Sequence, residues 1–303
     1  MKSVLVLYYS QSGQLKNIVD AVAKPLLACD QVQVDFAKYQ PKTDYPFPWS
    51  SDAFFDAFPE SRFGITCPMQ SMDIEANKHY DLIIFAYQVW YLSPSIPAWS
   101  ALHDPTIMQI MRGRPVVTVL GVRNMWVQAH YSITQRLKVL GASHVGNLVL
   151  TDPANNLVSV ITVIKWLIEG KQGPNGIWPR SGVPLARIEQ SYKYGDLILN
   201  ALKSENWASL QSNLVNAGAV DINFVLKTIE TNGHRIFGVW AKMILKKGQA
   251  GDTNRLPLIR IFKYYLLFMI FILSPIASLV FWIINFLFFP FARKHIRNIA
   301  LMH

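Results

Sequence analysis

Five short, almost uninterrupted apolar runs are the feature that most constrains how this chain can fold. Each run is rich in β-branched or aromatic residues and has the length of a strand buried on both faces. Segments with helical spacing lie between the runs, which is typical of parallel strands joined by crossover helices. The pattern predicts an α/β protein with a doubly wound, five-stranded parallel sheet. The predicted strands are Val4–Tyr9, Val32–Phe36, Leu82–Tyr87, Val116–Leu120 and Val145–Leu150.

Helices are predicted between the strands and after the last one. Apolar residues recur at helical spacing from Leu15 to Leu26 and from Ile133 to Leu140, where Gly141 is a suitable stop. A closing helix is expected over Leu185–Leu202. For five such strands we expect the order 2-1-3-4-5, with a ligand bound at the carboxyl ends of the strands.

Two stretches exceed what a minimal five-stranded domain needs. Pro41 to Lys78 is an insertion rich in proline and aromatic residues, and connections of this length usually carry function or helices of their own. Its aromatic residues either wall a groove for an alkyl chain or cover the second strand. Leu157–Ile168 is an apolar block after the fifth strand. We assign residues 1–205 to the sheet domain, 206–255 to an amphipathic helical linker and 256–303 to a hydrophobic membrane-anchoring segment with basic flanks.

The C-terminal part of the chain has the composition of a membrane segment. From Tyr264 to Phe291, 28 residues, no side chain is charged, and a span needs about 20 apolar residues. The residues just before it have the pattern of a basic interfacial helix. From His234 onward there are ten Lys and Arg residues and one acidic residue, so this part carries +9 of the net charge of +10. Basic residues that flank an apolar run indicate a membrane surface as partner, and not nucleic acid.

The sequence leaves the membrane topology open. Basic clusters on both flanks favour keeping both ends in the cytoplasm. Either a re-entrant hairpin bent near Pro275 or a single tilted span satisfies the pattern. Cys29 and Cys67 have no metal-like spacing, which predicts no metal site and a reducing compartment. We therefore expect the protein at the cytoplasmic face of the inner membrane. The flanking clusters are Arg255, Arg260 and Lys263 before the run, and Arg293, Lys294 and Arg297 after it.

The loop after the first strand predicts an anion site. Hydroxyls and backbone N–H groups at a helix N-terminus favour a phosphate, and Gly13 allows its close approach. The alternative is an ordinary turn with a serine cap. The loop matches neither the dinucleotide nor the nucleoside-triphosphate glycine pattern. The candidate phosphate-binding residues are Ser10, Gln11, Ser12, Gly13 and Gln14.

Two later loops follow the third and fourth strands and should lie beside the first. An isoalloxazine ring needs flat apolar faces and backbone donors for its pyrimidine edge. Trp90, Tyr91 and Trp126 supply such faces, although core packing explains any one of them equally well. Together the three loops predict a site for flavin mononucleotide (FMN). The further candidates are Gln88, Val89, Gly121, Arg123 and Asn124, of which the last three can reach the N1/O2 edge.

The first loop and the segment Tyr87–Tyr91 resemble those of flavodoxins and flavodoxin-like NAD(P)H:quinone reductases. Leu15 and Gln88 depart from the threonine and proline that are usual there. Over nearly its whole length the chain is similar to the flavodoxin-like "dialkylresorcinol condensing enzyme" proteins of bacterial aryl-lipid gene clusters. The matching features are the YYSQSGQL opening, the segments Tyr45–Trp49, Gln88–Pro94 and Asn124–Trp126, and the hydrophobic C-terminus.

That resemblance implies an FMN-dependent oxidation of a cyclohexanedione or cyclohexenone to a dialkylresorcinol. A separate ketosynthase, with an acyl carrier protein, would build the ring. We expect a ring hydride to move to the flavin while His130 or Tyr131 acts as base, although both also fit a helix surface. The alternatives are a quinone reductase that uses NAD(P)H as a second cofactor, and a non-catalytic, membrane-tethered electron carrier.

Overall fold

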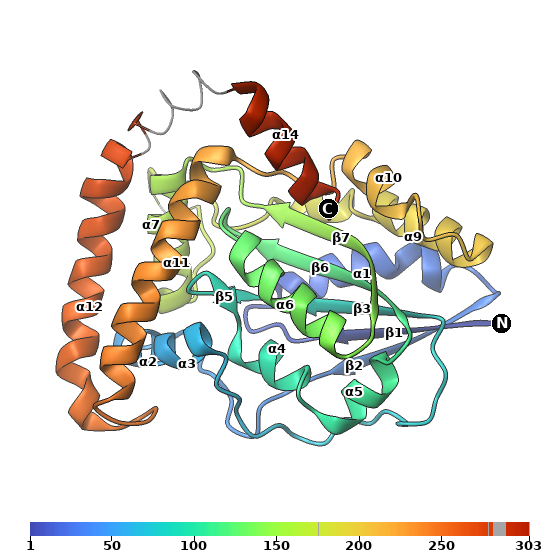
Figure 1. Ribbon diagram of the computed structural model, residues 1–303, viewed down its shortest axis with the longest axis horizontal. Helices are drawn as coiled ribbons and strands as arrows, with labels where there is room; N and C mark the ends of the chain where they lie inside the picture. Colours follow the sequence, from blue (N-terminus) through green and yellow to red (C-terminus); the bar gives the residue numbers. More distant parts are fainter. Residues whose placement is uncertain (175, 278, 281–288, 303) are drawn as a thin grey trace.

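A five-stranded parallel sheet forms the centre of the protein, in a computed structural model that describes residues 1–174, 176–277, 279–280 and 289–302 (Figure 1). The strand order is β2-β1-β3-β6-β7. Numbered along the sheet's own strands, this is the predicted 2-1-3-4-5 order, so the flavodoxin-like fold is confirmed. The strands are β1 (Lys2–Tyr8), β2 (Val32–Lys38), β3 (Leu82–Tyr87), β6 (Pro115–Val122) and β7 (Ser143–Thr151).

Helices cover both faces of the sheet because each central strand is apolar on both sides. One face packs on α1 (Gln14–Leu27), α8 (Leu185–Glu189), α9 (Tyr192–Ser204) and α10 (Leu210–Asn216). The other face packs on α4 (Ile96–Ala101), α5 (Pro105–Met111) and α6 (Val127–Val139). Every residue of β3 is buried, as expected for the middle of a covered parallel sheet.

The predicted closing helix is two helices in the structure. α8 ends at Glu189 and α9 begins at Tyr192, because the buried Ser191 turns its hydroxyl onto the Ile188 carbonyl at 2.6 Å. The break lets α9 approach α1 closely: a Cβ added to Gly195 would lie 2.0 Å from the Val22 carbonyl oxygen.

The insertion after β2 and the segments after β7 gather at the carboxyl end of the sheet. The insertion contains α2 (Ser51–Asp56) and α3 (Phe58–Phe63), and a small hairpin of β4 (Val89–Trp90) and β5 (Ser93–Pro94) follows β3. The apolar block becomes α7 (Asn156–Glu169). α11 (Phe224–Leu245) and α12 (Leu256–Phe268) lie side by side at the edge of the molecule (Figure 1).

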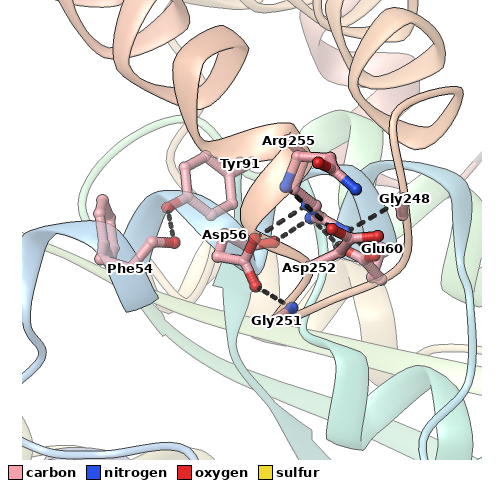
Figure 2. A network of polar contacts seen from close by, with 9 residues as sticks. Phe54, Asp56, Glu60, Tyr91, Gly248, Gly251, Asp252 and Arg255 are labelled. Carbon is pink, nitrogen blue, oxygen red and sulfur yellow. Dashed lines mark hydrogen bonds and ion pairs between the residues drawn. The ribbon is translucent and has the colours of Figure 1, made fainter.

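The start of α12 is held to the insertion by a buried ionic cluster (Figure 2). Arg255, in the short 3-10 helix η1 (Thr253–Arg255), is fully buried and binds both carboxylate oxygens of Glu60, at 2.7 and 2.9 Å. Its Nε also lies 2.8 Å from Oδ1 of Asp56, whose other oxygen accepts from the Gly251 N–H at 2.8 Å. The cluster joins residues almost 200 positions apart in the chain.

The apolar segment continues α12 without a break in its helical course. The described stretch Thr253–Ala277 is long and apolar enough to cross a membrane, and it includes one turn of π-helix, η2 (Met269–Leu273). The predicted bend near Pro275 is not seen, because this residue lies inside the helix that runs to Ala277. Residues 278 and 281–288, also within the charge-free run, lie outside the described residues. The chain then returns to the domain as α14 (Phe289–Ala300).

Candidate functional site

The first loop presents the N-terminus of α1 at the carboxyl end of β1. Ser10 Oγ accepts from the Lys16 N–H at 3.3 Å, so this hydroxyl closes the loop from within. Gly13 is the cap residue of α1, with φ of +85° and no side-chain hydrogen bond at the cap. That left-handed φ favours glycine, and a Cβ there would meet no atom within 4 Å. Open space therefore faces the first N–H groups of a 14-residue helix.

Glutamine side chains tie this loop to two distant segments. Gln11 Nε2 donates to the Pro46 carbonyl at 2.8 Å, which holds the insertion against the loop. Gln14 exchanges two hydrogen bonds with the backbone of Val183, donating at 3.3 Å and accepting at 3.2 Å. Neighbouring Gly182, with φ of +83°, packs so closely that a Cβ would lie 2.7 Å from the Gln14 amide. The predicted phosphate loop is thus fastened on both sides.

The second loop is a strained two-residue turn. Tyr91 and Leu92 both have positive φ, at 49° and 61°, which non-glycine residues rarely adopt. Ser61 Oγ donates to the Trp90 carbonyl at 3.0 Å and to the Pro94 carbonyl at 3.1 Å, while the Tyr91 hydroxyl donates to the Phe54 carbonyl. Strain that is held by surrounding bonds is a feature of binding sites, and here it fixes the backbone beside β3.

The three loops line one cavity of about 310 Å³, within the size range of small-molecule sites. The insertion adds aromatic residues to it, and α7 and the α12 segment close it with apolar side chains. The loops supply Gln11, Ser12, Gln14, Gln88, Val89, Trp90, Tyr91, Gly121, Arg123 and Met125; the added walls include Trp49, Phe54, Phe55, Val160, Val163, Ile164, Trp166, Leu167, Phe237, Leu266, Leu267 and Ile270.

Two polar atoms among the predicted flavin contacts are buried without a hydrogen-bond partner among the described residues. They are Oε1 of Gln88 and Oδ1 of Asn124. The other amide atom of Asn124 donates to Asn156 Oδ1 at 2.9 Å, which orients the side chain. A buried acceptor without a donor costs free energy, so Oε1 of Gln88, which lines the cavity, favours a ligand that carries an N–H group.

Arg123 brings a positive charge to the cavity. Its Nη1 donates to the carbonyl and the side-chain oxygen of Asn156, at 3.0 and 2.7 Å, which fastens the loop to the start of α7. Burial lowers the pKa of Arg123 to about 10, while the Asp152 carboxylate acts to raise it. The guanidinium remains charged at neutral pH.

Six predicted residues do not line the cavity. Ser10, Gly13 and Asn124 belong to its loops, but Trp126, His130 and Tyr131 lie elsewhere. Trp126 is 1% exposed and packs edge-on against His130 in the core. His130 Nδ1 lies 3.1 Å from the Tyr87 hydroxyl, and burial, with His144 nearby, holds the pKa of His130 well below its usual value. Tyr131 is 62% exposed. The base role of His130 and Tyr131 thus stays a prediction, without geometric support.

The contributions of α7, α11 and α12 to the cavity were absent from the sequence predictions. The composition of α7 held a signal for its contribution: between Leu157 and Ile168 the helix has one charged residue, Lys165, so it lacks the charged outer face of a surface helix. For α12 the run length pointed to lipid, although Leu266, Leu267 and Ile270 face the cavity.

Comparisons with known proteins find only distant structural likenesses. No family model matches the chain, and no curated protein matches it. A flavoprotein from Lactobacillus acidophilus NCFM, solved in complex with FMN, shares 18% identity, with 49% of this chain and 93% of that chain covered and a TM-score of 0.39. A flavodoxin from the domain Archaea shares 14%, with 56% and 95% covered and a TM-score of 0.33. The Trp repressor binding protein of Bacillus subtilis shares 15%, with 55% and 99% covered and a TM-score of 0.29. By its own strand order this protein belongs to the flavodoxin-like fold class.

Proposed function

We propose that this protein is an FMN-dependent oxidoreductase that acts on an apolar, lipid-like ring compound at a membrane. One observation carries the proposal: the three loops expected to hold FMN and the apolar side chains of α7 and α12 line the same cavity. A cofactor held by the loops would therefore meet a substrate surrounded by aliphatic and aromatic groups.

The residues present fit FMN. The open N-terminus of α1 at Gly13 suits the phosphate, and Trp90 lines the cavity as a flat apolar face. The unpartnered oxygen of Gln88, which lines the cavity, can accept from the ring N–H, and Arg123 offers positive charge toward the reduced ring. When bound, FMN accepts a hydride equivalent from the substrate.

The substrate we propose is a cyclohexane-1,3-dione with alkyl chains, or its hydroxycyclohexenone tautomer, which loses two hydrogens to become a dialkylresorcinol. Val163, Leu167 and Leu266 offer alkyl chains an apolar wall, and loss of water from such chains favours binding. A ketosynthase and an acyl carrier protein are the proposed suppliers of the ring. The C-terminal segment is the proposed anchor at the cytoplasmic face of the inner membrane.

Two alternatives use the same cavity. A quinone reductase would fill it with a quinone and would need NAD(P)H as reductant. A tethered electron carrier would exchange electrons with a protein partner and turn over no small molecule.

Anaerobic reduction of the bound flavin separates the three functions. We expect a 2,5-dialkylcyclohexane-1,3-dione to bleach the flavin absorbance of the detergent-solubilised full chain and to yield the resorcinol. Bleaching by NADPH with quinone-dependent recovery, and no reaction with the dione, would establish the reductase instead. A flavin that reacts with neither compound would indicate the carrier.

A cavity-filling variant tests whether the apolar wall holds the substrate. Val163→Trp should lower dione turnover about tenfold by overpacking the cavity, with FMN retained. Ile168→Trp, on the same helix but 37% exposed and not lining the cavity, should leave turnover unchanged. Equal turnover in the two variants would remove α7 from the substrate site.

A further inference from the structure

Both ends of the charge-free run are attached to the same folded domain. At its start, Lys263 Nζ donates to Ser51 Oγ of α2 at 2.8 Å. One residue earlier, the Phe262 ring stacks on Phe58 of α3, with ring centroids 4.0 Å apart and an interplanar angle of 8°. The Arg255 cluster lies about two helical turns earlier, so the point where the run leaves the domain is firmly placed (Figure 2).

The residues after the run are attached to the domain as well. Gln211 of α10 donates through Nε2 to the Ala300 carbonyl at 2.6 Å, and both residues are buried. Lys227 Nζ of α11 lies 3.0 Å from His295 Nε2. In Figure 1 α14 accordingly comes back toward the sheet beside α10. These contacts place the chain after the run against the same domain as the chain before it.

A hydrocarbon core about 30 Å thick separates the two ends of any single span. Ends that contact one folded domain cannot lie on opposite sides of it. We infer that the run is a monotopic anchor, which enters one leaflet and leaves it on the side from which it came. This inference resolves the choice between a span and a re-entrant course that the sequence leaves open.

The described part of the run has one face for lipid and one for the cavity. Tyr264, Phe268, Ile272 and Ile276 recur every four residues and are 68%, 51%, 51% and 58% exposed. Between them, Leu266, Leu267 and Ile270 line the cavity. Lys242, Lys246 and Lys247 lie near the start of α12, at the end of α11, where they complement anionic headgroups. The partner is therefore an anionic phospholipid leaflet.

The same geometry lets substrate enter the cavity from the leaflet. This conclusion rests on the proposed function. The α12 segment carries both the exposed apolar face and part of the cavity wall, so an apolar compound dissolved in the leaflet meets this helix first. It reaches the site along that helix without passing through water, which would disfavour its alkyl chains.

Labelling from each side of the membrane tests the topology in the full chain. Ala250→Cys before the run and Asn298→Cys after it are exposed positions, introduced singly into a Cys29→Ser, Cys67→Ser background. An impermeant maleimide is applied to spheroplasts and to inverted membrane vesicles. We expect both sites to react in the same preparation and neither in the other. Reaction of one site in each preparation would establish a span and overturn the inference. Release of the protein by carbonate washing would also overturn it, because the run would then not be inserted in the leaflet.

A second pair of variants tests the leaflet contact itself. Phe268→Glu with Ile272→Glu should reduce flotation with phosphatidylglycerol vesicles about a hundredfold, since each buried carboxylate opposes insertion. Leu27→Glu with Val139→Glu, at apolar positions 56% and 75% exposed on α1 and the end of α6, should float as before. Equal flotation would contradict the proposed face. Flavin absorbance in every variant separates failure of the topology from failure of FMN binding.

Discussion

Replacing Arg255 with methionine should detach α12 from the insertion, because it removes the charge that compensates two carboxylates. Glu60 is 7% exposed and receives two hydrogen bonds from the guanidinium, at 2.7 and 2.9 Å. Asp56 is less enclosed, and burial raises the pKa of its carboxyl although the Gly251 N–H and the Arg255 charge oppose this. Methionine fills much of the same volume but leaves both carboxylates unpaired.

The size of the effect follows from the burial of the pair. Removing one partner of a buried ion pair costs about 3–5 kcal/mol, chiefly because a charge is left uncompensated. The double variant Arg255→Met, Glu60→Leu removes that charge and should recover about half of the loss. Arg260→Met is the matched control, since Arg260 also joins the C-terminal segment to the insertion, through Asp52 of α2 at 3.3 Å, with side chains 62% and 50% exposed. An exposed pair of this kind contributes about 0–1 kcal/mol.

Urea unfolding at constant detergent measures the loss of stability. Limited proteolysis at the 246–254 turn measures whether α12 has detached from the insertion. Arg255→Met should lose stability or become cleaved in this turn, and Arg260→Met should do neither. If the two variants behave alike, or if the double variant is worse than Arg255→Met, the buried pair does not hold α12 as described.

Three further predictions concern the core, a buried acid and the cofactor. Gly195→Ala should lower the free energy of unfolding by about 1–3 kcal/mol, because its Cβ would lie 2.0 Å from the Val22 carbonyl oxygen. Thermal melting measures this loss, with Asn200→Ala at an exposed position of the same helix as the control. Burial raises the pKa of Glu230 from 4.5 to about 7, so the folded state holds a proton that the unfolded state has lost between these values. The free energy of unfolding should therefore fall by about 3 kcal/mol as pH rises from 4.5 to 7. Denaturation curves of Glu230→Gln should lack this fall. An equal fall in that variant would refute the raised pKa of Glu230 as its cause. Gln88→Leu should weaken FMN binding about tenfold in a fluorescence titration by removing the unpartnered acceptor, and unchanged affinity would exclude that contact.

The sheet was predictable because a parallel strand buried on both faces has a short, continuous run of apolar residues. All five runs became strands, and the strands pair in the expected order. The loops at their carboxyl ends were found for the same reason, since a parallel sheet brings those ends to one edge. The break between α8 and α9 was missed because one serine, Ser191, ends a helix by bonding back to the chain, and its neighbours keep a helical pattern.

Contacts over long separations were not predictable. Arg255 reads as one more basic flanking residue, and nothing in the sequence pairs it with Glu60, 195 positions earlier. Trp126 follows a strand as a flavin-stacking residue would, yet it is core. Leu266 and Leu267 read as lipid-facing because composition cannot tell a lipid surface from an apolar cavity.

Binding of FMN to the purified full chain tests the central claim most directly. We expect one FMN for each chain, with affinity about tenfold weaker in Gly13→Val, since a left-handed φ of +85° is costly for valine. Gly113→Val carries the same strain, with φ of +72° and open space around it, but Gly113 belongs to none of the loops that line the cavity, so the FMN affinity of this variant should be that of the unaltered protein. A chain that binds no FMN, or equal FMN affinity in the two variants, would contradict the account.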